Sequence, residues 1–298
     1  MASITVTDLI TYPIKSCAGI HLTQARITPR GLELDRDYML VDDEHDFVSQ
    51  RKVPELALVA PTVRSTSITL AAPGMQNAEL PLEVPRDDER VIRATVHGRE
   101  VLGQIVSDDL NEWFTRFLPR HKENRRYRLL RVREDAPRHI ASRYQKPGAS
   151  NQVGFADGNS MLLTTLPSLR QLNSAMDEPA PMNRFRPNVV VDGDDLAPYA
   201  EDCWTQVQIG AMTAFVVKAC DRCVIPDTDQ ETAAVGKAVR RALRTRKGVN
   251  AHDQTNKGVF FGQNLNHVYR PGLTVRVDEP LRVTEARAEP NVLIRALA

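Results

Sequence analysis

The sequence predicts a mainly β protein with some α-helix, built as two domains. From Ile4 to about Val106, short runs of apolar and β-branched residues alternate with turn residues, and many short strands at this spacing are typical of a β-sandwich or barrel. Helical apolar spacing is confined to a few short stretches. The chain has 298 residues, which exceeds one average domain, so two domains of modest size are favoured.

The elements of the first half end with a hairpin and a helix. His97 and Gly98 lie between two alternating runs, where glycine supplies the positive φ that a tight turn requires. Ser107 then precedes two aspartates and the run LNEWFTRFL, which gives a helix N-cap, acidic residues in the first turn and apolar residues at helical spacing. A helix is therefore expected to begin here.

The second half follows a polar segment after Pro119, in which only YRLLRV looks like a strand. We place the domain boundary there, with one domain over residues 1–120 and the other over residues 121–298. The run MLLTTLPSLRQLNSAM predicts a strand and then a helix with Met176 on its apolar face, and Thr164 and Thr165 lie where its N-cap belongs. Further strands are expected in NVVVDG, WTQVQIG, MTAFVVKAC, GVFFGQNLN and GLTVRVDEPLRV.

The composition argues against several classes of function. Lys and Arg together number 39 against 38 acidic residues, so no long-range field points to nucleic acid or to an anionic membrane. We find neither a secretory signal nor a stretch of about twenty apolar residues, so a soluble, cytoplasmic protein is expected. Without a secretory signal, the four cysteines do not indicate a disulfide framework.

The strongest local signal is ACDRC, which contains Cys220 and Cys223 and comes at the end of an apolar run. A thiolate at a strand end, with Arg222 beside it, would be a good ligand for a soft metal. A structural zinc site normally needs four ligands, and the sequence offers no second C-x-x-C pair and no closely spaced histidine pair. A thioredoxin-like pair would need a helix to open at the motif, which Pro226 disfavours. Two buried, merely packed cysteines remain an alternative.

Several motifs in fixed order resemble the MOSC family. In the second half these are RFRPNVVVDG, YAEDCW, QIG, ACDRCVIPDTD and FFGQNL, and in the first half YPIKSCAG and LDRDYMLV resemble the β-barrel domain that precedes MOSC in one branch of the family. That branch includes the mitochondrial amidoxime-reducing components and their bacterial relatives. The resemblance runs from about Val6 to Val277 and implies an N-terminal β-barrel domain followed by a MOSC β-barrel domain with peripheral helices.

The resemblance also implies a pyranopterin molybdenum cofactor held between the two domains, with the thiolate of Cys223 as the protein ligand to the metal. Cys220 would then be a supporting or merely packed residue. One soft, anionic protein ligand suits a molybdenum centre that changes oxidation state while it exchanges an oxo group. Asp221, the nearest acidic residue in the sequence, is the candidate proton donor in catalysis.

The expected cofactor-binding residues are Lys15, Ser16, Arg36, Thr165, Arg186, Asn188 and Arg222. Lys15 and Ser16 match the family's phosphate-holding pair, an ammonium and a hydroxyl, although a lone surface lysine would look the same. Thr165 begins a helix, where a capping hydroxyl and an anion site coincide; simple N-capping is the alternative. The Arg186 guanidinium and the Asn188 amide can bond phosphate or pterin atoms, whereas a surface salt bridge is the alternative for Arg186.

The implied reaction is the two-electron reduction of N-hydroxylated substrates such as amidoximes and hydroxylamines, by oxo transfer. No cysteine follows Cys223, so we expect no iron–sulfur cluster here and an external electron donor of the ferredoxin, flavodoxin or cytochrome type, with its reductase. The basic stretch from about Thr232 to Arg246 predicts a helix that is either a solvated face or a docking surface for an acidic donor. Two alternatives stay open: a cofactor-binding or sulfur-carrying protein in which Cys223 holds a persulfide, and a metal-free fold with structural cysteines.

Overall fold

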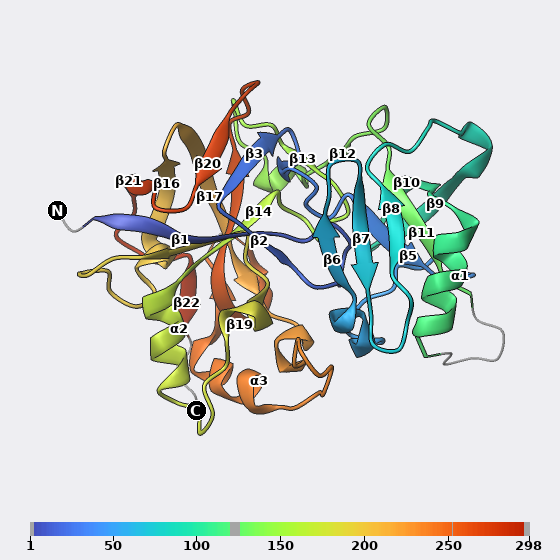
Figure 1. The fold of residues 1–298 in the computed structure, drawn as a ribbon. Coiled ribbons are helices and arrows are strands. Elements are labelled where there is room, and N and C mark those ends of the chain that lie inside the picture. Colours follow the sequence, from blue (N-terminus) through green and yellow to red (C-terminus); the bar gives the residue numbers. More distant parts are fainter. Residues whose placement is uncertain (1–2, 120–125, 252, 295–298) are drawn as a thin grey trace.

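Strands dominate the computed structural model, which describes residues 3–119, 126–251 and 253–294. The ribbon divides into a β-barrel, on the left of Figure 1, and a second body of sheets on the right. The prediction of a mainly β protein with some α-helix is thereby confirmed. The predicted boundary between residues 120 and 121 lies outside the described residues.

Seven strands close into the barrel. In order around it they are β14 (Met161–Thr165), β15 (Val189–Asp192), β1 (Ile4–Thr11), β21 (Pro280–Ala286), β16 (Trp204–Ile209), β17 (Met212–Asp221) and β19 (Asp253–His267), which pairs back with β14. Successive strand residues face opposite sides, so alternating apolar residues such as Val189 and Val191 fill the interior. β1 comes from the N-terminal end of the chain yet pairs with β15 and β21, so both ends of the sequence build the barrel.

The second body contains two main sheets. One has the order β5 (Tyr38–Val41), β11 (Arg128–Val132), β10 (Arg99–Ile105) and β9 (Val91–Val96), and the other consists of β6 (Ala60–Val63), β7 (Ser67–Ala71) and β8 (Ala78–Pro81). The predicted hairpin joins β9 to β10, and both His97 and Gly98 have positive φ there. β11 follows residue 120 in the sequence but pairs with β5 and β10, so its hydrogen bonds belong to this body.

The remaining strands are short. They are β2 (Ile20–Leu22), β3 (Gln24–Thr28), β4 (Gly31–Leu32), β12 (Arg138–His139), β13 (Gln152–Val153), β18 (Lys247–Asn250), β20 (Thr274–Arg276) and β22 (Val292–Ile294). Single turns of 3-10 helix are η1 (Pro54–Leu58), η2 (Asp88–Arg90), η3 (Ser142–Tyr144), η4 (Met182–Phe185), η5 (Ala200–Cys203), η6 (Ile225–Asp227) and η7 (Leu243–Arg246). Most of these 3-10 helices lie in the segments that connect the longer strands.

Three α-helices pack against these sheets in the described part of the chain. α1 (Asp108–Phe117) begins where the sequence predicts, because the Ser107 hydroxyl accepts the Leu110 N–H at 3.2 Å. α2 (Leu166–Asn173) is capped by Thr165, one of the two threonines predicted at its start, but ends before Met176. Within the described residues, no helix is long and apolar enough to span a bilayer.

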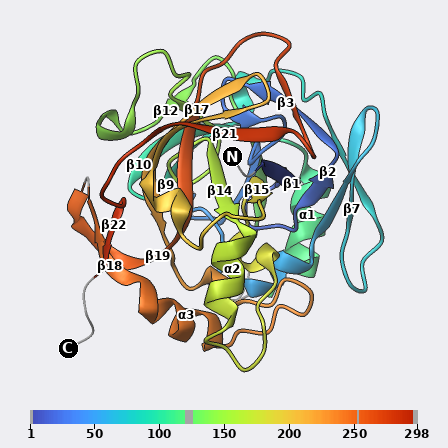
Figure 2. The same cartoon turned by 90° about the vertical axis from the view of Figure 1, so that its left-hand side faces the viewer.

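The predicted basic helix is shorter than the sequence suggested. α3 (Ala238–Ala242) begins six residues later than expected, and η7 follows it directly. Asp229 accepts the backbone N–H groups of Glu231 and Thr232, and Ala233 has a φ of 61°, so the chain is held in a tight turn before α3 begins. Figure 2 shows α2 and α3 side by side outside the barrel, where their apolar residues share one core.

Candidate functional site

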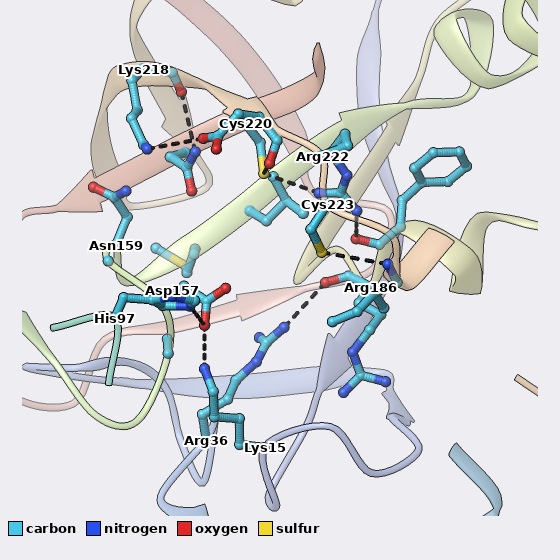
Figure 3. A pocket seen from close by; sticks show the side chains of 18 of the residues that line it. Lys15, Arg36, His97, Asp157, Asn159, Arg186, Lys218, Cys220, Arg222 and Cys223 are labelled. Atoms are coloured by element: carbon cyan, nitrogen blue, oxygen red, sulfur yellow. Dashed lines mark hydrogen bonds and ion pairs between the residues drawn. The ribbon is translucent and has the colours of Figure 1, made fainter. Parts of the chain in front are cut away.

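A cavity of about 430 Å³ lies between the barrel and the second body (Figure 3). Its described walls carry eight lysine and arginine side chains but only two carboxylates. The basic residues are Lys15, Arg36, Arg51, Arg99, Arg143, Arg186, Lys218 and Arg222, and the acidic ones are Asp157 and Asp221. This excess of positive charge in a partly enclosed site favours an anionic ligand.

Most of the predicted site residues line this one cavity, although they come from distant parts of the sequence. Those present are Lys15, Ser16, Arg36, Arg186, Asn188, Asp221, Arg222 and Cys223. The end of β1, the segment before β15 and the loop after β17 deliver them to the junction of the two bodies. The fold therefore brings these residues together in one site.

Thr165 is not in the cavity. Its side chain is fully buried, and its hydroxyl accepts the Ser168 N–H at 3.2 Å and lies 3.2 Å from a Glu201 carboxylate oxygen. In this structure its hydroxyl caps α2 and joins a buried polar cluster, and the expected contact of Thr165 with the cofactor stays a prediction. Sequence alone could not separate these roles, because both use a hydroxyl at a helix start.

Cys223 lies in the loop between β17 and η6. Its Sγ accepts the Ile225 N–H at 3.5 Å, and the Arg51 side chain donates to the same sulfur. Burial lowers the pKa of Arg51, but Asp157 and Cys223 together raise it above its ordinary value. Cys220 has a different environment, because Arg222 Nη1 donates to its Sγ at 3.0 Å. Cys223 thus has donors that suit an anionic sulfur facing the cavity.

The described part of the chain offers Cys223 no partner ligands for a metal. Among the residues that the structure describes, no three His, Cys, Asp or Glu side chains are grouped closely enough to hold a metal ion. A structural zinc site is almost always four-coordinate through protein ligands. A metal bound at Cys223 would therefore bring its other ligands with it, as a metal within an organic cofactor does.

Lys15 and Ser16 follow β1 in a turn held against β5. The Lys15 N–H donates to Tyr38 O at 2.8 Å, while Lys15 Nζ donates to Phe155 O at 2.9 Å and forms an ion pair with Asp157. Burial lowers the pKa of Lys15, and the Asp157 charge opposes this effect. Ser16 has a φ of 72°, a strained conformation of the kind that gathers at ligand sites.

Two guanidinium groups lie beside the Tyr12 ring. The Cζ atoms of Arg36 and Arg186 are each 4.3 Å from its centroid, and both arginines have positive φ. Arg36 is paired with Asp35 at 2.7 Å and donates to Asn188 Oδ1 at 3.0 Å. Asn188 Nδ2 in turn donates to Asp35 Oδ1 at 2.9 Å, so the predicted amide braces the wall of the site.

Arg186 carries the clearest sign of a missing ligand. Its Nη1 donates to Gln230 Oε1 at 3.2 Å, but its buried Nη2 has no hydrogen-bond partner among the residues that the structure describes. Burial lowers the pKa of Arg186 to about 10, and the neighbouring Arg36 charge acts in the same direction. A phosphate oxygen would satisfy the unpaired donor and compensate the charge. The donor set at this end of the cavity therefore fits a phosphate-bearing cofactor.

The sequence did not identify Arg51, His97 and Asp157 as cavity residues. Asp157 forms ion pairs with Lys15, with Arg51 at 3.2 Å and with His97 at 3.1 Å. Desolvation raises the pKa of Asp157, but these charges outweigh it and hold the pKa well below its ordinary value. Arg138 fixes the loop by donating to the Asp157 carbonyl at 3.0 Å. Arg51, His97 and Asp157 lie in none of the chemical motifs recognised in the sequence, so only the tertiary structure could identify them.

Comparison with known proteins matches both halves of the chain to family descriptions. Residues 3–121 match the MOSC N-terminal beta barrel domain, and residues 150–282 match the MOSC domain. The mitochondrial amidoxime-reducing component 1 of Homo sapiens is 30% identical over 93% of this chain and 82% of its own length. The Mus musculus protein of that name is 31% identical over 93% and 81%. Mitochondrial amidoxime reducing component 2 of Bos taurus is 28% identical over 89% and 78%.

These matches include the segments that carry Lys15, Arg186 and Cys223. The chain belongs to the MOSC-domain family, in the branch that carries an N-terminal MOSC β-barrel domain and includes the mitochondrial amidoxime-reducing components.

Proposed function

We propose that this protein is a molybdenum-cofactor-dependent oxidoreductase that reduces N-hydroxylated substrates such as amidoximes and hydroxylamines. The observation that carries the proposal is one cavity that combines the Cys223 thiol with the buried Arg186, whose Nη2 lacks a hydrogen-bond partner within the described residues. Similarity to amidoxime-reducing components supports the reaction class. Electrons would come from an external carrier of the ferredoxin, flavodoxin or cytochrome type with its reductase.

The cavity residues have different roles in this proposal. Lys15, Ser16 and Arg186 would hold the cofactor phosphate, and Cys223 would bind the metal. Arg36 and Asn188 brace the wall beside Arg186 through the hydrogen bond between them. When bound, the cofactor would supply the electron pair that breaks the substrate N–O bond.

Reduction of an N–OH group consumes two electrons and two protons and releases water. Lys218 and Asp221 form an ion pair at 3.3 Å on the cavity wall, close in sequence to Cys223. Burial lowers the pKa of Lys218, but the charges of Asp221 and Cys220 raise it above its ordinary value. This pair is the proton-holding group that we assign to the reaction, and it includes the carboxylate predicted from the sequence.

The test is dye-driven turnover of protein purified from a host that makes the cofactor. Reduced methyl viologen supplies electrons, benzamidoxime is the substrate, and benzamidine formation is measured. We expect activity in the wild type and in Cys220→Ala, and its loss in Cys223→Ala. If cofactor-loaded wild type forms no benzamidine, the reductase proposal fails and the cofactor- or sulfur-carrier alternative gains.

A further inference from the structure

The outer side of the wall that carries Cys223 is strongly basic. We call the exposed side chains of Lys237, Arg240, Arg241, Arg244 and Lys247 the basic surface. From Thr232 to Lys247 the sequence contains six Lys and Arg residues and no Asp or Glu; the sixth, Arg246, is turned inward and paired with Asp202. The basic surface therefore concentrates positive charge on a chain whose net charge is only +1.

A thin layer of structure separates this surface from the cavity. η6 begins two residues after Cys223. Its Ile225 and Pro226 line the cavity, while Asp227 contacts α3. Asp227 accepts the backbone N–H of Arg240 at 3.0 Å and pairs with its guanidinium at 3.3 Å. Consecutive residues of η6 thus contact the cavity on one side and the helix of the basic surface on the other.

The loop between η6 and α3 adds an apolar contact point. Val235 is 59% exposed, which is unusual for a large apolar side chain among the described residues. Its loop is ordered by the Thr228–Val235 bridge, and Gln230 in the same loop contacts Arg186 in the cavity. An exposed apolar residue close in sequence to several exposed basic residues is suited to binding a protein partner, because apolar contact supplies affinity while charge sets orientation.

We propose that the basic surface, with Val235 at its edge, is the docking site for an acidic one-electron carrier protein. The inference rests on the proposed reductase function, which needs an external donor. Charge complementarity identifies the partner as acidic and raises the rate of encounter. Docking here places the donor against the η6 wall beside Cys223 and leaves the hairpin side of the cavity, at His97 and Arg99, open to substrate.

The test compares two double charge reversals in the holoprotein. Arg241→Glu with Arg244→Glu alters the basic surface, and Arg270→Glu with Arg282→Glu is the matched control at exposed positions elsewhere on the barrel. An acidic [2Fe–2S] ferredoxin and an acidic cytochrome, each kept reduced by its own reductase, drive benzamidoxime reduction; reduced methyl viologen drives it without docking. Melting temperature checks folding.

For at least one carrier, we expect kcat/KM to be about tenfold or more lower in the surface variant than in the wild type. The wild-type kcat/KM should decrease between about 50 and 300 mM NaCl, whereas that of the surface variant should not change over this range. The viologen rate should stay within about twofold, and the control pair should behave like the wild type. If neither carrier supports turnover, or both variants respond equally, the docking proposal is overturned. Absent viologen activity would instead count against the reductase function.

Binding of the oxidised carriers, measured by thermophoresis, gives a readout that needs no catalysis. We expect the Kd of the productive carrier to rise about tenfold in the surface variant only. Unchanged affinity for both carriers, with loss of binding to RNA or to anionic vesicles instead, would assign the basic surface to another partner and refute the proposal.

Discussion

The Arg186 guanidinium lies over the Tyr12 ring, with its Cζ 4.3 Å from the ring centroid. Arg36 lies at the same distance from that ring, so one aromatic side chain positions both arginines of the anion-binding wall. A cation–π contact of this kind contributes about 0.5 to 2 kcal/mol. The buried Tyr12 hydroxyl finds no hydrogen-bond partner in the described part of the chain, so the tyrosine contributes here through its ring.

Replacing Tyr12 separates the ring from the hydroxyl. Tyr12→Leu should weaken binding of inorganic phosphate to the cofactor-free protein by about fivefold, because the guanidinium groups lose their platform. Tyr12→Phe should keep the wild-type affinity and should not lower the melting temperature, since the lost hydroxyl is unpaired. Calorimetric titration measures the affinity; equal weakening in both variants would contradict a role for the ring.

Replacement of Arg186 should have opposite effects on the stability of the cofactor-free protein and on cofactor binding. Its charge is buried with an unpaired donor, so Arg186→Met should stabilise the cofactor-free protein by about 1 kcal/mol or more. The same variant should retain little cofactor because it lacks the donor for phosphate. Urea unfolding and pterin analysis measure the two effects. Loss of stability in the cofactor-free variant would refute the idea that Arg186 is uncompensated there.

The buried cluster that contains Thr165 predicts a dependence of stability on pH. Burial, followed by the Asp202 charge, raises the pKa of Glu201 from 4.5 to about 7. The folded state therefore holds this proton more tightly than the unfolded state, so the contribution of Glu201 to stability is full below about pH 4.5 and is lost as pH rises to about 7. The loss should be about 3 kcal/mol.

The control for this pH effect is Glu201→Gln, which keeps the size of the side chain but cannot titrate. Its free energy of unfolding, measured by urea titration across this pH range, should not show the decrease with rising pH that the wild type owes to Glu201. An unchanged slope against pH would show that another group is responsible.

Gly262 is required where β19 crosses β14. It has a φ of 79°, and a Cβ there would lie 2.8 Å from the carbonyl oxygen of Leu163. Gly262→Ala should therefore destabilise the protein by about 3 kcal/mol. Gly272→Ala is the matched control, because Gly272 has a φ of 77° but open space around it, and it should cost about 1 kcal/mol. Equal losses in thermal unfolding would exclude the steric explanation.

The features that could be predicted from the sequence are those that a short segment of the chain specifies by itself. Lys15, Arg186 and Cys223 lie in recognisable motifs, and the structure brings all three to one cavity. The strands were predictable because alternation of apolar residues reflects a sheet with one buried face. The caps of α1 and α2 were predictable because the capping hydroxyl and the backbone N–H that it accepts are only three residues apart.

What the sequence could not show depends on long-range contacts. The pairing of β1 with β21 joins opposite ends of the chain, and no local pattern specifies it. Asp157 and Arg51 meet only because two separate loops converge. The late start of α3 depends on Asp229, which competes for the backbone N–H groups before the helix.

The central claim is that Cys223 is the protein ligand to molybdenum, and X-ray absorption at the molybdenum edge tests it most directly. Wild type, Cys223→Ser and Cys220→Ser would be purified from a host that makes the cofactor. We predict that Cys223→Ser loses one sulfur neighbour of the metal while Cys220→Ser keeps the wild-type spectrum. An unchanged sulfur count in Cys223→Ser, or the loss of a sulfur in Cys220→Ser, would contradict the assignment.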